Sequence, residues 1–168
     1  AKGCKVSEIS TCIMDRSRHA DLIAEVRAAG AAIRLIGDGD VAGIIHTTAP
    51  DETGIDLYMG IGGAPEGVLA AAALRCTGGQ MQGRLILDTD EKRERAARMG
   101  VDNPEKAYTM EEMASGDVLF AATGVTDGNM LKGVKFKDGI IETHTVVMRS
   151  STGTVRWIDA DHADTSKF

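Results

Sequence analysis

The sequence contains little of several residue types, and each shortage excludes a class of protein. It has three cysteines, an odd number, and no two of them form a C-x-x-C pair. This argues against a disulfide framework and against a cysteine-based zinc site, so we expect a reducing, cytoplasmic environment. The longest apolar run, Val68 to Leu74, is far shorter than the roughly 20 residues that cross a bilayer. We therefore expect no membrane-spanning helix and no membrane partner.

Excess positive charge is also absent. The formal net charge is −6, so the chain as a whole does not attract nucleic acid, and we expect no nucleic-acid partner. No charged and then apolar leader opens the sequence, which predicts no secretion. The first residue is Ala1 rather than Met, which indicates processing or a fragment.

The rest of the composition is typical of one globular α/β domain. The chain has 168 residues, of which 43% are hydrophobic and 26% charged, and no linker or repeat divides it, so we expect residues 1–168 to form one domain. Twenty glycines against three prolines indicate many tight turns between strands and helices.

Hydrophobic periodicity predicts three strand-turn-helix units and then antiparallel strands. The units are 7–14 with 20–29, 33–36 with 41–46, and 55–59 with 66–75. Consecutive units of this kind imply a parallel sheet with right-handed crossovers. Further along, we predict a helix over 90–99 and strands over 84–87, 118–122, 134–137, 140–148 and 154–158. Asp138-Gly139 and Ser151-Thr152-Gly153 are hairpin signals, whereas Thr126-Asp127-Gly128 predicts a turn into a short helix. We therefore expect an α/β fold with a mixed sheet.

Polar loops follow the first three predicted strands, where ligands of open α/β sheets bind. The first loop presents Arg16 and Arg18 at alternate positions, so in an extended segment both guanidinium groups would point the same way. This arrangement suits a phosphate, because each charge-assisted hydrogen bond is worth roughly 1.5–3 kcal/mol. Alternatively, the pair neutralises carboxylates on a solvated helix start, namely Asp15, Asp21 and Glu25.

The second loop, Asp38-Gly39-Asp40, places a carboxylate on each side of a glycine. The carboxylates can accept hydrogen bonds from neighbouring sugar hydroxyls while the glycine lets the backbone approach closely. They can instead bind a divalent cation. A purely structural alternative is that Asp40 caps the following helix and Asp38 makes a turn bond.

The third loop, 60–67, is a glycine run that leads into a helix. It lacks the Lys-Ser/Thr of a P-loop, and Pro65 stands where a dinucleotide motif has its third glycine. Both kinds of nucleotide site are therefore disfavoured, although an anion could still bind the helix N-terminus. Glu66 either stabilises the helix dipole there, by ~0.3–1 kcal/mol, or ligates a metal that bridges to a bound phosphate.

Weaker candidates add little. Asp159, Asp161, His162 and Asp164 form an acidic C-terminal cluster that could hold a cation or be a solvated tail. No Ser-His-Asp or Cys-His set is present that would predict nucleophilic catalysis.

Several motifs together resemble class II fructose-1,6-bisphosphatases in order and spacing. The matching segments are Asp15-Arg16-Ser17-Arg18-His19, 36–42, 58–67, 122–128 and 149–156. The resemblance covers nearly the whole chain and is closest to the dual fructose-1,6-/sedoheptulose-1,7-bisphosphatases of photosynthetic bacteria. It implies a metal-dependent cytoplasmic hydrolase of the lithium-sensitive phosphatase superfamily, with a layered α/β/α/β/α fold and a homotetrameric assembly.

The resemblance also implies roles for individual residues. It makes Glu66 a ligand of a catalytic divalent cation, Mg or Mn. It assigns seven residues to the sugar bisphosphate: Arg16, Ser17, Arg18, Asp38, Gly39, Asp40 and Gly63. Ser17 departs from the Pro that many family members carry there, which would leave the loop less rigid.

The motifs for the other metal-binding carboxylates of the family are absent from this sequence. The family places them in an N-terminal half that resembles inositol monophosphatase. The resemblance thus implies a C-terminal, substrate-holding half whose partner is that N-terminal half. The whole enzyme would remove the 1-phosphate of fructose 1,6-bisphosphate and, in dual members, accept sedoheptulose 1,7-bisphosphate. A second hypothesis is a non-catalytic sugar-phosphate-binding or regulatory module that lacks the metal half.

Overall fold

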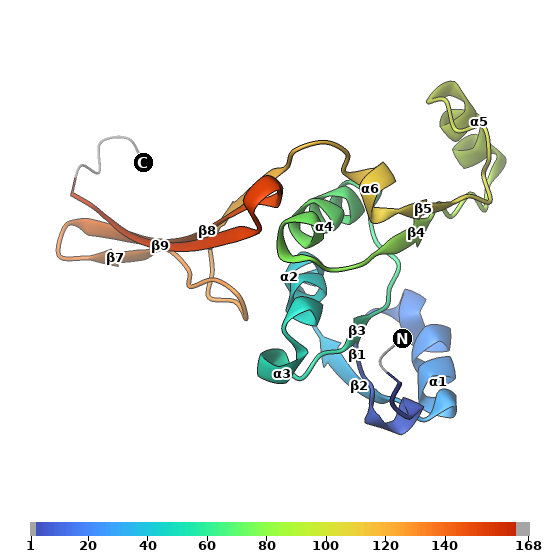
Figure 1. The fold of residues 1–168 in the computed structure, drawn as a ribbon, viewed down its shortest axis with the longest axis horizontal. Helices are drawn as coiled ribbons and strands as arrows, with labels where there is room; N and C mark the ends of the chain where they lie inside the picture. Colours follow the sequence, from blue (N-terminus) through green and yellow to red (C-terminus); the bar gives the residue numbers. More distant parts are fainter. Residues whose placement is uncertain (1–2, 164–168) are drawn as a thin grey trace.

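The strands of the chain lie in three separate sheets in the computed structural model, which describes residues 3–163 (Figure 1). The first sheet has the order β2-β1-β3 and is built from β1 (Ser10–Met14), β2 (Ala32–Ile36) and β3 (Leu57–Tyr58). Strand β1 runs parallel to both neighbours. The predicted parallel strand-turn-helix units are therefore present.

Helices cover both faces of this parallel sheet. On one face, α1 (Ala20–Ala29) packs Ile23 and Val26 against Ile13 of β1. The helix ends at Gly30, whose φ of 89° is in the left-handed region that glycine adopts without strain. On the other face, α2 (Asp40–Ile45) comes so close at Gly43 that a Cβ there would lie 3.3 Å from the Cys12 sulfur.

The second core lies between helix α4 and an antiparallel sheet. Helix α4 (Ala64–Thr77) buries its alanine-rich side, and the sheet has the order β6-β8-β7 with β9 on the other side of β8. Its strands are β6 (Leu119–Thr123), β7 (Lys135–Lys137), β8 (Ile140–Arg149) and β9 (Thr154–His162). Ala73 and Cys76 of α4 pack with Val146 and Met148 of β8 in one buried cluster.

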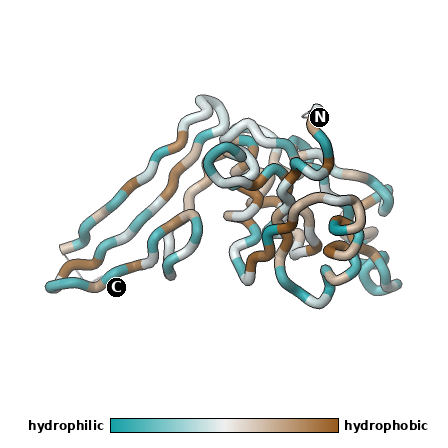
Figure 2. The backbone as a smooth tube through the Cα atoms, turned by 90° about the horizontal axis from the view of Figure 1, so that it is seen from below, coloured by the Kyte–Doolittle hydropathy of each residue, from teal (hydrophilic) through white to brown (hydrophobic). Residues whose placement is uncertain are grey.

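Exposed apolar side chains lie on two strands of this sheet, β6 and β7. Leu119 lies opposite Arg149, one position along from the buried pair Phe120 and Met148, and Phe136 lies opposite Ile141, which is buried. Phe136 is 78% exposed and Leu119 73% exposed. Brown apolar segments are visible along these strands in Figure 2.

A charged arm leaves the body beyond α4 (Figure 1). It consists of the antiparallel pair β4 (Gln82–Arg84) and β5 (Ala107–Thr109), with α5 (Asp90–Arg98) between them and α6 (Met110–Met113) after them. Arg75 of α4 ties the arm to the body, because its guanidinium group donates to the carbonyls of Ala114 and Gly116. The remaining short elements are η1 (Val6–Glu8), η2 (Ser17–His19), η3 (His46–Thr48), α3 (Pro50–Thr53) and η4 (Ser150–Thr152).

The structure corrects several expectations. The α/β fold with parallel strands followed by antiparallel strands is confirmed, but the two kinds of strand occupy separate sheets instead of sharing one mixed sheet. The strand predicted over 84–87 is shifted to 82–84, because β5 offers partners only to those residues. Residues 126–128 do not lead into a helix, because the Asp127 carboxylate accepts the Gly133 N–H and closes a loop. Strand β9 continues to His162, so part of the acidic cluster is strand, and Asp164 lies outside the described residues.

Two expectations agree with the structure, one drawn from the small number of cysteines and one from the lack of a long apolar run. Cys4, Cys12 and Cys76 are free thiols. In the part of the chain that the structure describes, no helix is both long and apolar enough to cross a membrane.

The second core predicts a contrast between two methionines. Met148→Ala should lower the free energy of unfolding by roughly 2–5 kcal/mol, because Met148 is 1% exposed and its removal leaves a cavity. Met99→Ala should change it by less than about 0.5 kcal/mol, because Met99 is 74% exposed. Urea unfolding of the full-length protein measures both, and equal effects would contradict this description of the core.

Candidate functional site

The loops after β1, β2 and β3 lie together at one edge of the parallel sheet. Backbone hydrogen bonds join their starting points: Asp15 N–H donates to the Ile36 carbonyl at 2.8 Å, and Met59 N–H donates to the Cys12 carbonyl at 3.1 Å. We call the three segments 15–19, 37–40 and 59–63 the rim loops. They contain most of the residues singled out from the sequence.

His19 is the buried side chain that connects two of the rim loops. It is fully buried, its Nδ1 lies 2.7 Å from the Met14 carbonyl oxygen, and its Nε2 accepts the Ile61 N–H at 2.8 Å. Nε2 also lies 3.1 Å from the Ile61 carbonyl oxygen, and the shorter contacts are both satisfied by the tautomer in which Nδ1 donates to Met14 and Nε2 accepts from Ile61. The histidine thus binds the first rim loop to the third.

The two arginines of the first rim loop point to different neighbours. The segment is not extended as predicted, because Ser17–His19 form a 3-10 turn and separate the two side chains. Arg16 donates to the Gly37 carbonyl at 2.6 Å, whereas Arg18 Nε donates to the Ile61 carbonyl at 2.8 Å. Arg16 therefore supports the second rim loop and Arg18 the third.

The terminal nitrogens of Arg18 have no hydrogen-bond partner within residues 3–163, and the side chain is exposed. Neither arginine pairs with a carboxylate of the neighbouring helix start; in the described part of the chain both donate to backbone carbonyls. The neutralising alternative therefore gains no support, and Arg18 keeps donors that can bind an anion.

The two carboxylates of the second rim loop face different parts of the site. Gly39 has a φ of 75° and is the N-cap of α2, so the capping position falls on the glycine and not on Asp40. Asp40 Oδ1 accepts the Val41 N–H at 2.9 Å, and its Oδ2 lies 3.5 Å from where a Cβ on Gly62 would be. Asp38 instead lines a pocket shared with residues of the loop after β6.

Gly63 leaves space that the Glu66 carboxylate occupies. Helix α4 begins at Ala64, Gly63 is its N-cap, and Glu66 lies in the first turn. A Cβ on Gly63 would overlap Glu66 Oε2. The carboxylate therefore folds back over the N-terminus of the helix, where its charge is favourable.

Glu66 has the chemistry of a magnesium or manganese ligand, but it stands without a complete set of partners. Such ions prefer oxygen ligands in octahedral arrangement, and a carboxylate at an open rim supplies one. No three His, Cys, Asp or Glu side chains gather to hold a metal within the described residues. The residues present fit one ligand of such an ion.

Tyr58, at the end of β3, has a raised pKa because of its surroundings in the rim. Burial, then the nearby charge of Asp40 and the Cys12 thiol, raise the pKa of Tyr58 to about 12, although Arg18 opposes the shift. Burial also raises the pKa of the Cys12 thiol, so it stays protonated and unreactive at neutral pH.

Sequence reasoning missed His19 and Tyr58 as parts of the site. A single histidine or tyrosine carries no spacing pattern, and nothing in the sequence marked His19 beyond its place beside Arg18. Within the described residues no buried polar side-chain atom lacks a partner, so the buried polar groups of the rim are hydrogen-bonded within the protein, whereas the exposed terminal nitrogens of Arg18 are not.

Tyr58 makes stability depend on alkaline pH. The unfolded chain loses the tyrosine proton above about pH 10, whereas the folded protein keeps it until about pH 12. Stability is therefore present below pH 10 and falls as the pH rises from 10 toward 12, by about 1 kcal/mol at pH 11. Denaturation curves at pH 9, 10 and 11 should show a shallower fall for Tyr58→Phe than for wild type, and parallel falls would contradict the assignment.

The bonds of His19 predict a local and a global effect of its removal. His19→Leu leaves the Met14 carbonyl and the Ile61 N–H without their buried partner, at roughly 1–3 kcal/mol for each group. Hydrogen exchange should accelerate at the Ile61 amide and change less at the Met59 amide, which is bonded to Cys12. Unchanged exchange at Ile61 would show that the third rim loop is held by other contacts.

Comparison with known proteins places these motifs in one family. Residues 1–162 match the family model described as bacterial fructose-1,6-bisphosphatase, glpX-encoded. A protein of Synechococcus sp. (strain JA-3-3Ab), named D-fructose 1,6-bisphosphatase class 2/sedoheptulose 1,7-bisphosphatase, is 45% identical over 171 residues, covering 94% of this chain and 49% of the relative.

Proteins with the same name from Synechocystis sp. and Gloeobacter violaceus are 46% and 44% identical over 170 residues, with the same coverage. This chain spans about half the length of the curated relatives that it matches. Since the family model matches nearly all of its residues, the chain belongs to the glpX-encoded bacterial fructose-1,6-bisphosphatase family.

Proposed function

We propose that the protein containing this chain hydrolyses the 1-phosphate of fructose 1,6-bisphosphate and also accepts sedoheptulose 1,7-bisphosphate. The similar proteins carry both activities in their names. The observation that carries the proposal is the hydrogen-bonded rim, in which His19 and Arg18 both bind Ile61. Residues that the family resemblance assigns to the substrate thus come together at one sheet edge.

In this proposal different rim residues bind different parts of the substrate. Arg16 and Arg18 bind a phosphate group, Arg18 through its free terminal nitrogens, and Ser17 contacts the same group. Asp38 and Asp40 accept hydrogen bonds from sugar hydroxyls on either side of Gly39, and Gly63 lets the substrate approach the start of α4. These arrangements hold and orient the substrate before the reaction.

Glu66 is proposed to supply one ligand of the divalent cation, Mg or Mn. When bound, such a cation activates water and neutralises charge on the phosphoryl group and the leaving oxygen. Because no cluster of three ligands exists among residues 3–163, the other ligands are proposed to come from the N-terminal half of the same enzyme.

The proposal extends to a cytoplasmic location, which the cysteine usage favours, and to a homotetramer, which the family resemblance implies. The exposed apolar side chains of Leu119 and Phe136 support burial of these two side chains against another segment or subunit. The second candidate, a non-catalytic sugar-phosphate-binding module, is favoured only by the lack of a three-ligand cluster in the described part.

Arg18→Ala tests the proposal in the full-length protein. Loss of the charge-assisted bonds should lower kcat/KM for phosphate release from fructose 1,6-bisphosphate by roughly 10- to 150-fold. The matched control is Arg98→Ala, because Arg98 is exposed on α5 in the charged arm and should leave kcat/KM unchanged.

Unchanged kcat/KM for Arg18→Ala would remove Arg18 from the site. If wild-type protein binds fructose 6-phosphate but releases no phosphate from either bisphosphate with Mg²⁺ or Mn²⁺ present, the binding-module candidate replaces the hydrolase.

A further inference from the structure

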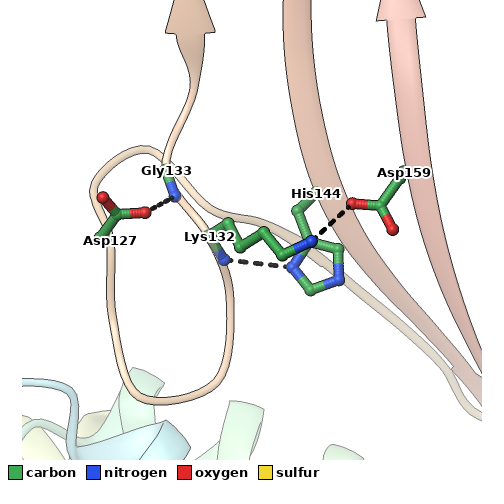
Figure 3. A network of polar contacts seen from close by, with 5 residues as sticks. All are labelled: Asp127, Lys132, Gly133, His144 and Asp159. Atoms are coloured by element: carbon green, nitrogen blue, oxygen red, sulfur yellow. Dashed lines mark hydrogen bonds and ion pairs between the residues drawn. The ribbon is translucent and has the colours of Figure 1, made fainter.

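The loop between β6 and β7, residues 124–133, is a closed structure that the proposed site has not yet used. Its backbone closes on itself, because Gly128 N–H donates to the Leu131 carbonyl at 2.9 Å and Val134 N–H donates to the Val125 carbonyl at 3.2 Å. The Asp127 carboxylate accepts the Gly133 N–H at 2.9 Å across the loop (Figure 3).

Two glycines form the narrow base of the loop. A Cβ on Gly133 would lie 2.7 Å from the Asp127 backbone nitrogen, and a Cβ on Gly124 would overlap the Lys132 carbonyl oxygen. Backbone atoms cannot move aside as a flexible side-chain end can, so the two sides of the loop approach this closely only with glycine at both positions. The shape of the loop is therefore set by its own sequence.

The loop is also fixed to the antiparallel sheet. Lys132 N–H donates to His144 Nδ1 at 3.1 Å, and the Lys132 ammonium pairs with Asp159 at 3.2 Å (Figure 3). The His144 ring stacks on Trp157, with 5.6 Å between ring centroids. The base is thus attached to both β8 and β9, while the tip projects toward the rim loops.

The tip of the loop and the second rim loop line a partly open pocket between them. Its polar side chains are those of Asp38, Thr126 and Asn129, and Ala42 and Leu131 provide apolar walls. The lining contains a carboxylate and no Lys or Arg, so it disfavours a phosphate. A carboxylate, a hydroxyl and an amide beside apolar carbon atoms suit a neutral, hydroxylated carbon chain.

We propose that Asn129 and Thr126 are specificity-determining residues that bind sugar hydroxyls opposite Asp38. Asp38 accepts hydrogen bonds, whereas the Asn129 amide and the Thr126 hydroxyl both donate and accept, so together they match groups that do both. The inference rests on the proposed function and adds to it: the rigid 124–133 loop limits the length of carbon chain that fits, and thereby sets the preference between six- and seven-carbon bisphosphates.

Asn129→Leu in the full-length enzyme tests the inference, because leucine has a similar size but no polar atoms. Leaving the substrate hydroxyl without this partner should raise KM roughly 3- to 10-fold with a smaller change in kcat. The ratio of kcat/KM for fructose 1,6-bisphosphate to that for sedoheptulose 1,7-bisphosphate should also change, by at least about 3-fold. Asn103→Leu, in the exposed arm, is the matched control and should change none of these values.

Inorganic phosphate as a competitive inhibitor separates sugar binding from a general structural role. Its inhibition constant should stay within about 2-fold for Asn129→Leu, because phosphate has no sugar hydroxyls to lose. Unchanged KM values would overturn the inference, and so would a parallel weakening of both sugars and of inorganic phosphate. Thr126→Val, a shape-conserving change, should alter the substrate ratio in the same direction even if Asn129→Leu does not fold.

The inference and the proposed function fail in different ways. If wild type releases no phosphate from either sugar, the proposed function is wrong. Calorimetric binding of fructose 6-phosphate to wild type and Asn129→Leu then still tests the pocket, where equal affinity would overturn the inference.

Discussion

The position of the third rim loop depends on the hydrogen bonds of one buried imidazole. Strand β3 pairs with β1 through only two residues, Leu57 and Tyr58, so the sheet itself holds little of the segment that follows. His19 continues the connection past the end of the strand by accepting the Ile61 N–H while donating to Met14. The position of the residues between Ile61 and the start of α4, including Gly63, therefore depends on where Ile61 is held.

The arginines, to which the proposed function gives a binding role, also hold the loops together. Each spends part of its guanidinium group on a backbone carbonyl of a neighbouring loop. Side chains fixed in this way have already lost much of their rotamer freedom, so less entropy is lost when a ligand binds. The two carboxylates of the second rim loop face different parts of the site: Asp40 lies toward Gly62, and Asp38 lies toward the 124–133 loop.

The features predicted correctly from the sequence depend on local chemistry. Gly30 ends α1 with positive φ, and Asp138 and Gly139 both have positive φ in the hairpin between β7 and β8, because these turns require such residues within one or two positions. The sequence motifs likewise located the rim loops, although the roles of Arg16, Asp38 and Glu66 stay predictions.

Errors arose where distant residues decide the outcome. Residues 85–87 are apolar and were therefore predicted to be part of a strand, but β5 does not extend far enough to pair with them. The helix expected after Thr126 fails because Asp127 bonds to Gly133 further along the chain. His19 was overlooked for the same reason, since its partner Ile61 is 42 residues away.

The glycine base of the 124–133 loop has a consequence for how the protein can evolve. Gly124 and Gly133 set the narrow base of the loop through close backbone approach, and the Asp127 carboxylate closes it, so the side chains of Thr126 and Asn129 are not needed to maintain that shape. Selection can therefore exchange residues such as Asn129 without rebuilding the fold around them. The two glycines and Asp127 carry the constraint, and the side chains at the tip are left free to change.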